Sequence, residues 1–324
     1  MSSLSRRRFL ALGGSGLAAV GVSAYSLTHA AEPVSGAGAN WPPTPTAVPT
    51  QPPAPTPTPR PIEPRGRVAA TLLPGSDYQV DGVAIHSGQP GPRLMVLGGV
   101  HGNEPGGWFA AEAIANWEIK TGSLLVFPRV NWRAAAIVER TLPEIGDINR
   151  AYPGDPNGVP AQRIANAIID AGREFRPELL FDLHESWVFY QERGANNGTA
   201  FIGQTVAIGG GATEGTVDRI ANVVRMVNGA ISTREEFLMR GAATPRPGIQ
   251  IVPPNNPAPG APRPQTPPSN GVTFNGTSSL SLGQWIPGCV PILVEMGQRD
   301  QAERRRSDLH QMLVRTTLEQ SGMM

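Results

Sequence analysis

Short apolar runs alternate with longer amphipathic segments along the last three quarters of the chain. Four runs rich in Leu, Val and Ile predict strands that are buried on both faces, namely Leu94–Val100, Leu124–Val130, Glu178–Leu183 and Pro291–Val294. Four segments with apolar residues three and four positions apart predict helices, namely Trp108–Trp117, Ala161–Phe175, Thr216–Ile231 and Gln301–Gln320. The alternation predicts an α/β domain with a mixed, largely parallel central sheet covered by helices on both faces.

The first 66 residues have a different pattern. Residues 1–31 contain Ser5-Arg6-Arg7-Arg8-Phe9-Leu10 followed by an uncharged apolar stretch, which is typical of a twin-arginine export signal. Residues 32–66 are rich in Pro and Thr, with twelve prolines between positions 33 and 64, and predict a disordered linker. We therefore expect the twin-arginine export machinery to deliver the domain formed by residues 67–324 outside the cytoplasm. A membrane tether remains the alternative if the signal is not cleaved.

Three further features limit the interpretation of the domain. A Pro-rich segment at 253–269 interrupts it and predicts a long surface loop. The formal net charge is +1, and no basic cluster outside the export signal indicates nucleic-acid binding. The run Arg304-Arg305-Arg306 is interpreted as a solvated helix face. Because Cys289 is the single cysteine, the chain cannot form an intramolecular disulfide, and we expect this residue to be an inert buried thiol.

Three predicted central strands lead directly into a polar residue, and these residues are His101, His184 and Glu295. In open α/β sheets ligands bind outside the carboxyl ends of the strands, so segments distant in sequence can meet there. A single histidine at a strand end is more often a hydrogen-bonded structural residue than a ligand. The coincidence of three such ends, rather than any one of them, therefore predicts a site.

A possible metal ligand set emerges from these strand ends. Glu104 follows His101 by three positions in a glycine-rich turn. Zinc accepts imidazole nitrogen and carboxylate oxygen, and a catalytic zinc keeps three protein ligands with one position open. Because a lone His-x-x-Glu pair often arises by chance, the prediction depends on His184 as the third ligand. We predict that His101, Glu104 and His184 hold one zinc ion.

Glu295 follows an apolar run, where burial raises the pKa of a carboxyl group toward the range of a general base. Zinc lowers the pKa of a bound water to about 7 and polarises a carbonyl. Glu295 would accept the proton of this metal-activated water and pass it to a leaving amine. The alternative for Glu295 is a carboxylate held in a salt bridge.

The motifs that support a family resemblance occur in a fixed order along the chain. They are Gly99-Val100-His101-Gly102-Asn103-Glu104, Asn131-x-Arg133-Ala134, Asp147-Ile148-Asn149-Arg150, Asp182-Leu183-His184 and Val294-Glu295-Met296-Gly297. This order resembles the zinc carboxypeptidases of the M14 type, with the succinylglutamate desuccinylase/aspartoacylase branch closest. The resemblance covers roughly Leu94 to Gln298 and is specific because order and strand placement agree together.

The resemblance implies further roles. Arg150, together with Asn149, would hold a substrate carboxylate, for which a guanidinium offers two parallel donors. Arg140 would stabilise the oxyanion, with a purely structural arginine as the alternative. Asp147 would hydrogen-bond His101 and fix its orientation.

Two departures from the family affect the expected substrate. Carboxypeptidases of this type carry a tyrosine shortly before the catalytic Glu, whereas this sequence has none after Tyr190. The segment after Glu295 predicts a helix instead of the pocket-narrowing β-domain of aspartoacylases. We expect hydrolysis of an amide next to a carboxylate in N-acyl amino acids. The alternatives are a carboxypeptidase or amidase acting on peptides or peptidoglycan stems, and a zinc-holding binding domain without turnover. Oligomeric state remains open.

Overall fold

The computed structural model describes residues 62–189, 202–231, 249–251 and 277–324. The predicted export signal, the predicted linker up to residue 61 and the predicted Pro-rich loop lie outside the described residues. The chain divides into one unit at 1–58 and another at 59–324, and all described residues belong to the second. Within them, no helix combines the length and the apolar character needed to span a membrane.

The described residues form an eight-stranded sheet in the order β1-β2-β4-β3-β5-β8-β6-β7. The strands are β1 (Gly66–Leu72), β2 (Val80–His86), β3 (Arg93–Gly98), β4 (Ser123–Phe127), β5 (Leu179–Ser186), β6 (Thr205–Ile208), β7 (Ile249–Ile251) and β8 (Val290–Gly297). The four central strands β4, β3, β5 and β8 are parallel. Antiparallel β1 and β2 extend one side, and β6 pairs antiparallel with β8 on the other. The mixed α/β sheet is thus confirmed.

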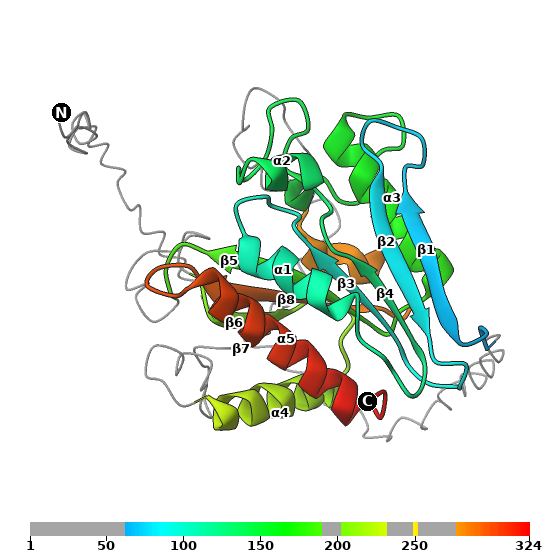
Figure 1. Ribbon diagram of the computed structural model, residues 1–324, viewed down its shortest axis with the longest axis vertical. Coiled ribbons are helices and arrows are strands. Elements are labelled where there is room, and N and C mark those ends of the chain that lie inside the picture. The colour runs from blue at the N-terminus through cyan, green and yellow to red at the C-terminus, as the bar shows by residue number, and fades with distance from the viewer. Residues whose placement is uncertain (1–61, 190–201, 232–248, 252–276) are drawn as a thin grey trace, which may run out of the picture. The chain divides into compact units, whose positions relative to one another are not determined.

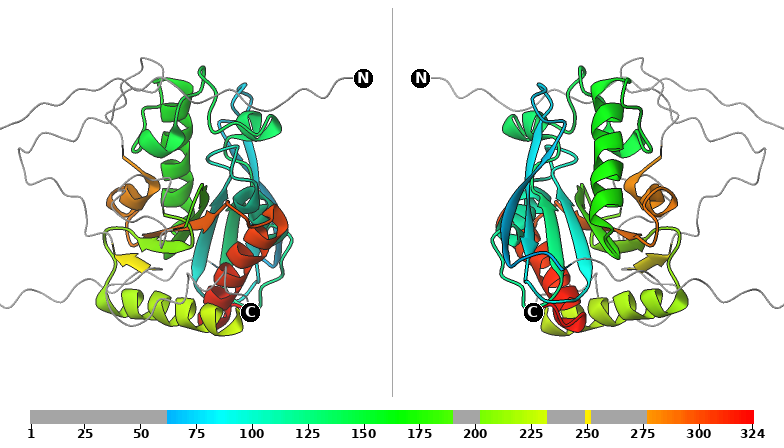
Figure 2. Two further views of the ribbon diagram at one scale, coloured as in Figure 1. Left: turned by 90° about the vertical axis from the view of Figure 1, so that its left-hand side faces the viewer. Right: turned by 90° about the vertical axis from the view of Figure 1, so that its right-hand side faces the viewer.

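Helices cover both faces of this sheet (Figures 1 and 2). They are α1 (Pro105–Ile114), α2 (Trp132–Ala136), α3 (Pro160–Phe175), α4 (Glu214–Ala230) and α5 (Glu303–Gln320), with 3-10 turns η1 (Ile148–Arg150) and η5 (Ser279–Gln284). Helices α1, α4 and α5 lie on one face and α3 lies on the other. Because strand side chains alternate between faces, each face has its own core. Phe181 and Val294 pack in the first core, whereas Leu180 packs with Ile168 of α3 in the second.

Local signals in the sequence set the ends of the covering helices. Pro160 occupies the first turn of α3, where its missing N–H costs no intrahelical bond. The helix stops where Arg176 adopts a left-handed conformation with φ of 54°. The side chain of Thr213 caps α4 by accepting from the backbone N–H of Thr216 at 3.2 Å. These caps fix the length of each helix against the sheet.

The strand ends differ from the sequence prediction. β3 stops at Gly98, two residues before the predicted end, whereas β5 and β8 continue through His184 and Glu295 to Ser186 and Gly297. The prediction that those two strands end before their polar residues was wrong, because the backbone ladder continues although the side chains change character. His184 pairs directly with Glu295 across this ladder. Strands β1, β6 and β7 were not predicted. β1, at one edge of the sheet, is largely exposed and carries no continuous apolar run.

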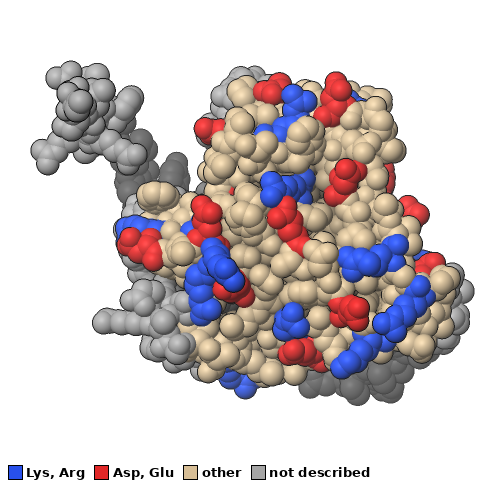
Figure 3. Space-filling model, in the orientation of Figure 1, with Lys and Arg blue, Asp and Glu red and all other residues tan. Residues whose placement is uncertain are grey.

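The arginine run at the start of α5 is not uniformly solvated. Arg304 is exposed, but Arg306 is only 6% exposed. The interpretation of all three arginines as a solvated face was therefore wrong for Arg306, which turns toward the sheet. On the face seen in Figure 3, acidic and basic side chains are interspersed among uncharged ones.

Candidate metal centre

The turn between β3 and α1 carries two of the predicted ligands. Gly99 adopts a φ of +62°, and a Cβ at Gly102 would lie 2.2 Å from the carbonyl carbon of Ala134 in α2. Only glycine fits such a close approach, so the turn is pressed against α2. The turn thereby delivers His101 and Glu104 to one place at the carboxyl end of the sheet.

The three predicted ligands meet in a buried cluster. The Nδ1 atom of His101 lies 2.7 Å from Oε1 of Glu104, and Nδ1 of His184 lies 2.7 Å from Oε2. The two Nδ1 atoms are 3.0 Å apart. Ligand atoms around a tetrahedral zinc, with bonds of about 2.0–2.1 Å, lie about 3.3 Å from one another. The three side chains, each at most 3% exposed, could therefore share one metal ion after small adjustments.

The outer nitrogen of each imidazole faces a carboxylate. Nε2 of His101 lies 3.0 Å from Oδ1 of Asp147, and Nε2 of His184 lies 2.8 Å from Oδ2 of Asp182. When the outer nitrogens donate to these carboxylates, both inner nitrogens present lone pairs toward Glu104. Three buried electron-pair donors then converge where a cation would satisfy them. This chemistry of the donor set fits a divalent metal.

Electrostatics inside the cluster favour an ionised Glu104. Burial alone would raise the pKa of this carboxyl, but the neighbouring imidazoles of His101 and His184 outweigh burial and hold the pKa well below its usual range. Burial lowers the pKa of His184, because it disfavours the charged imidazolium, yet Asp182 and Glu104 raise this pKa well above the ordinary value. The carboxylates around His184 therefore favour positive charge in the cluster, which is what a metal cation would supply.

Asp182 was assigned no role from the sequence, although it lies in a quoted motif. In a strand, residues two positions apart point to the same face, so Asp182 and His184 share the face covered by α3. Both side chains are 1% exposed. The Asp-x-His spacing in a predicted strand was the available signal for this contact.

Glu295 lies beside the cluster on the neighbouring strand. It is in register with His184 across parallel strands, so the two side chains leave the sheet on the same face. The hydroxyl of Ser186 donates to Oε2 of Glu295 at 2.9 Å. Burial raises the pKa of Glu295 to about 7, with His184 lowering it and Glu104 raising it further. A carboxyl with this pKa is poised for proton transfer near neutral pH.

Arg140 lies at the rim of the centre. Its guanidinium donates to Oε1 of Glu104 at 3.3 Å and to Oδ2 of Asp147 at 3.3 Å, while its side chain is 44% exposed. The structure thus places Arg140 between a ligand and solvent. Its predicted role at the oxyanion stays a prediction.

Asn149 and Arg150 follow in the turn η1. The amide oxygen of Asn149 accepts from the backbone N–H of Ser279 at 2.8 Å, and its Nδ2 lies 3.5 Å from Nε2 of His184. Arg150 donates to the carbonyl of Asn149 at 2.7 Å and is partly exposed. The structure therefore brings both residues to the centre, with the amide oxygen of Asn149 already engaged. Their predicted binding of a substrate carboxylate stays a prediction.

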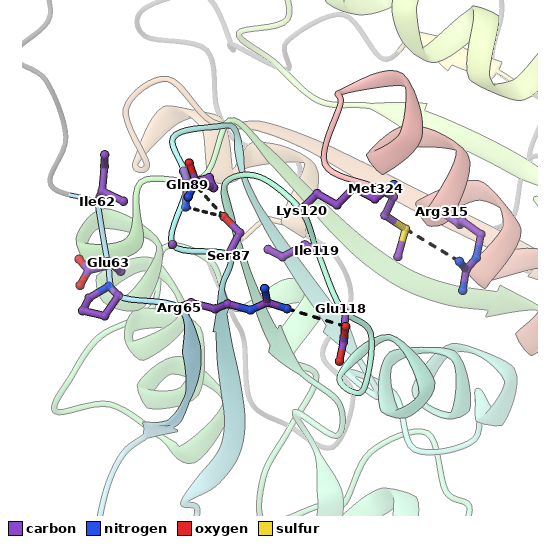
Figure 4. Close-up of a pocket in the computed structure, with 12 residues that line it drawn as sticks. Ile62, Glu63, Arg65, Ser87, Gln89, Glu118, Ile119, Lys120, Arg315 and Met324 are labelled. Carbon is purple, nitrogen blue, oxygen red and sulfur yellow. Dashed lines mark hydrogen bonds and ion pairs between the residues drawn. The ribbon is translucent and has the colours of Figure 1, made fainter.

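A hollow of about 720 Å³ lies away from the metal centre, at the opposite end of the parallel strands (Figure 4). Residues 62–65 meet there with the β2–β3 turn, the segment between α1 and β4, and the end of α5. Arg65 lies 4.0 Å from Glu118 across it. Its lining includes no His or Cys, and the metal-binding cluster found among the described residues lies elsewhere.

Comparisons with known proteins find similarity over part of this chain. Residues 90–187 match a family model described as the succinylglutamate desuccinylase/aspartoacylase catalytic domain. The chain is 34% identical over 80 residues to N-alpha-acetyl-L-2,4-diaminobutyric acid deacetylase of Halomonas elongata, a match that covers 24% of this chain and only 23% of the relative.

Two solved structures show the same fold at low sequence identity. A succinylglutamate desuccinylase/aspartoacylase from Rhodobacter sphaeroides matches with a TM-score of 0.52 and 17% identity, covering 82% of this chain and 68% of that one. A tripeptide-bound cell shape determinant protein from Helicobacter pylori matches with a TM-score of 0.52 and 14% identity, covering 72% and 52%.

Residues 90–187 thus match the catalytic domain of the succinylglutamate desuccinylase/aspartoacylase family, in line with the resemblance that the sequence predicted. Members of this family are amino-acid deacylases, which are hydrolases. The matched segment contains His101, Glu104 and His184 but ends before Glu295. The assignment of Glu295 therefore depends on the structure, in which it adjoins His184.

Proposed function

We propose that this chain is an exported, zinc-dependent hydrolase that cleaves an amide bond adjacent to a carboxylate, with N-acyl amino acids as substrates. One observation carries the proposal: three buried electron-pair donors converge, and Glu295 stands in register beside one of them. The relative from Halomonas elongata, named as a deacetylase of an N-acetyl amino acid, supports the substrate class. The twin-arginine motif supports export.

The residues of the chain divide the chemistry among them. His101, Glu104 and His184 would hold zinc, which supplies Lewis acidity that lowers the pKa of water and polarises a carbonyl. Glu295 accepts a proton from the attacking water and passes it to the departing amine. Ser186 holds Oε2 of Glu295 at 2.9 Å and so fixes the direction in which the carboxylate faces.

The remaining side chains orient groups. Asp147 and Asp182 fix the two imidazoles from outside. Arg140 would donate hydrogen bonds to the negative charge that develops on the carbonyl oxygen. Arg150 provides a cation for the substrate carboxylate.

The proposal is tested with the full chain and the variant Glu295→Gln. Gln has nearly the same shape and can still accept from Ser186, but it cannot take up a proton. We expect the variant to bind zinc as the wild type does while turnover falls by about 10²- to 10⁴-fold, the usual contribution of a general base. Glu319→Gln, an exposed change on α5, is the matched control and should leave turnover unchanged.

The substrate panel distinguishes the alternatives. It contains N-acetyl-2,4-diaminobutyrate, N-succinylglutamate, N-acetylaspartate and short peptides with a free carboxyl terminus, each assayed with zinc and with a chelator. Zinc-dependent release from the N-acyl amino acids supports the proposal. Release only from peptides indicates the carboxypeptidase alternative. Ligand binding that is equal in wild type and Glu295→Gln, without hydrolysis by either, indicates a binding domain and refutes the proposal.

A further inference from the structure

A buried polar cluster lies behind the metal ligands, on the opposite face of β5, and consists of Glu185, Arg306 and Gln298. Glu185 follows the ligand His184 and points toward α1 and α5, and its side chain is fully buried. Its Oε1 accepts from Nε of Arg306 at 2.9 Å, and its Oε2 accepts from Nε2 of Gln298 at 3.0 Å. A buried carboxylate is tolerated when it is paired and hydrogen-bonded in this way. The reaction described above uses none of these three side chains.

This group is connected to the metal ligands by two routes. The backbone N–H of Glu185 donates to Oε2 of Glu104 at 3.0 Å. The amide of Gln298 also donates to the carbonyl of Asn103 at 2.8 Å, in the turn between His101 and Glu104. Gln298 therefore joins the buried carboxylate to the turn that carries two ligands.

The packing around Glu185 leaves little room for the turn to move. A Cβ at Gly106 would lie 2.1 Å from Oε1 of Glu185, so the carboxylate sits directly against the first turn of α1. The amino end of a helix also favours a nearby negative charge. Because α1 starts immediately after Glu104, a carboxylate held at this helix end also holds the turn that precedes it.

We propose that Gln298, Glu185 and Arg306 are positioning residues of the metal centre. They hold the turn from Gly99 to Glu104 in the geometry that the ion requires, without touching ion or substrate. The inference rests on the proposed function, because it assumes that the centre binds zinc. Its physical basis is preorganisation: ligands that are already ordered lose less conformational entropy when the metal binds.

The decisive comparison is between two glutamines three positions apart. Gln298→Ala removes the hydrogen bonds to Asn103 and Glu185 and leaves the ion pair with Arg306 in place. Gln301→Ala is the matched control, because Gln301 also makes two amide hydrogen bonds, to Gln204 and to the carbonyl of Gly297. Neither of those bonds reaches the ligand turn.

Zinc affinity of the full chain is measured by competition with a chelator, and the absorption spectrum of the Co²⁺-loaded protein reports ligand geometry. We expect Gln298→Ala to raise the zinc dissociation constant about tenfold, the lower end of the range for groups that orient metal ligands, and to change the Co²⁺ spectrum. Gln301→Ala should change neither, although both variants lower the melting temperature. Glu185→Gln, which keeps size and backbone N–H but loses the charge, should weaken zinc binding as Gln298→Ala does.

The outcomes separate this inference from the proposed function. Wild-type zinc affinity and an unchanged Co²⁺ spectrum in both Gln298→Ala and Glu185→Gln would overturn the positioning role while leaving the hydrolase intact. An equal loss of affinity in Gln301→Ala would also overturn it, since general destabilisation would then explain the result. A wild-type chain that binds no zinc would refute both.

Discussion

Replacing Asp182 by Asn tests the carboxylate–histidine contact that the sequence left unassigned. Asp182 Oδ2 lies 2.8 Å from Nε2 of His184, and both side chains are 1% exposed. Asn can still accept the imidazole N–H through its amide oxygen, but it carries no charge. We therefore expect the orientation of His184 to survive, while the basicity of its inner nitrogen falls.

The size of the effect follows from the burial of the pair. Partners that hydrogen-bond a metal ligand typically contribute 10- to 100-fold in metal affinity, or about 1.4–2.7 kcal/mol. Asp147, the equivalent partner of His101, has a longer contact of 3.0 Å, is 13% exposed and is shared with Arg140. Because solvent and a second cation weaken that contact, Asp182→Asn should cost more zinc affinity than Asp147→Asn.

Zinc dissociation constants are measured by chelator competition at one pH for both variants and for Asp170→Asn. Asp170 pairs with Arg173 at the surface and is 61% exposed, so its replacement controls for the loss of one carboxylate. Circular dichroism of the zinc-free proteins checks folding. Wild-type zinc affinity in a folded Asp182→Asn protein, or an equal loss in Asp170→Asn, would show that the contact does not tune the metal.

Three further predictions concern stability, reactivity and substrate binding. Gly102→Ala would place a methyl group 2.2 Å from a backbone carbon, so it should lower the free energy of unfolding by about 1–3 kcal/mol in urea titrations. Gly66→Ala is the control and should be neutral, because a Cβ at Gly66 meets open space. Equal stability of the two variants would refute the steric argument. Burial raises the pKa of Cys289 to about 12, so the native protein should resist labelling by iodoacetamide at pH 8. Labelling should rise only on unfolding or as the pH approaches that pKa. Rapid labelling of the native protein at pH 8 would contradict this prediction. Arg150→Gln should raise KM more than it lowers kcat for substrates that carry a carboxylate, because the variant loses the cation that would bind this group. KM for the corresponding substrates with an amide in place of the carboxylate should not change. An equal rise of KM for both kinds of substrate would exclude the carboxylate contact.

The central strands and covering helices could be predicted because their apolar periodicity is strong and local. The ends of the strands were harder to predict, because β5 and β8 retain their hydrogen-bond ladder through His184 and Glu295. A change from apolar to polar side chains marks where a strand reaches the site, and the strand itself need not end there. The exposed edge strand β1 escaped prediction because its exposed positions carry no burial signal.

Within the centre, the ligand residues could be predicted from the sequence, but several of their partners could not. His101 and Glu104 are three positions apart, and the strand ends indicated where His184 would join them. Ser186 and Glu295 are separated by 109 residues, and no local pattern pairs a serine with a carboxylate at that distance. Arg306 was assigned to solvent for the same reason, because its partner lies 121 residues earlier in the chain.

The alternation of side chains along β5 explains how one strand can serve two functions. Its even-numbered residues Asp182, His184 and Ser186 face the centre, whereas Glu185 faces α5. Because strand side chains have a period of two, a shift of register by one residue would exchange these faces. His184 would then face α1 and α5, and Glu185 would face the metal centre. The Glu185–Arg306 pair therefore opposes such a shift, since Arg306 would then face an imidazole. Polar groups on the far side of the sheet thus help to specify the register on which the metal site depends.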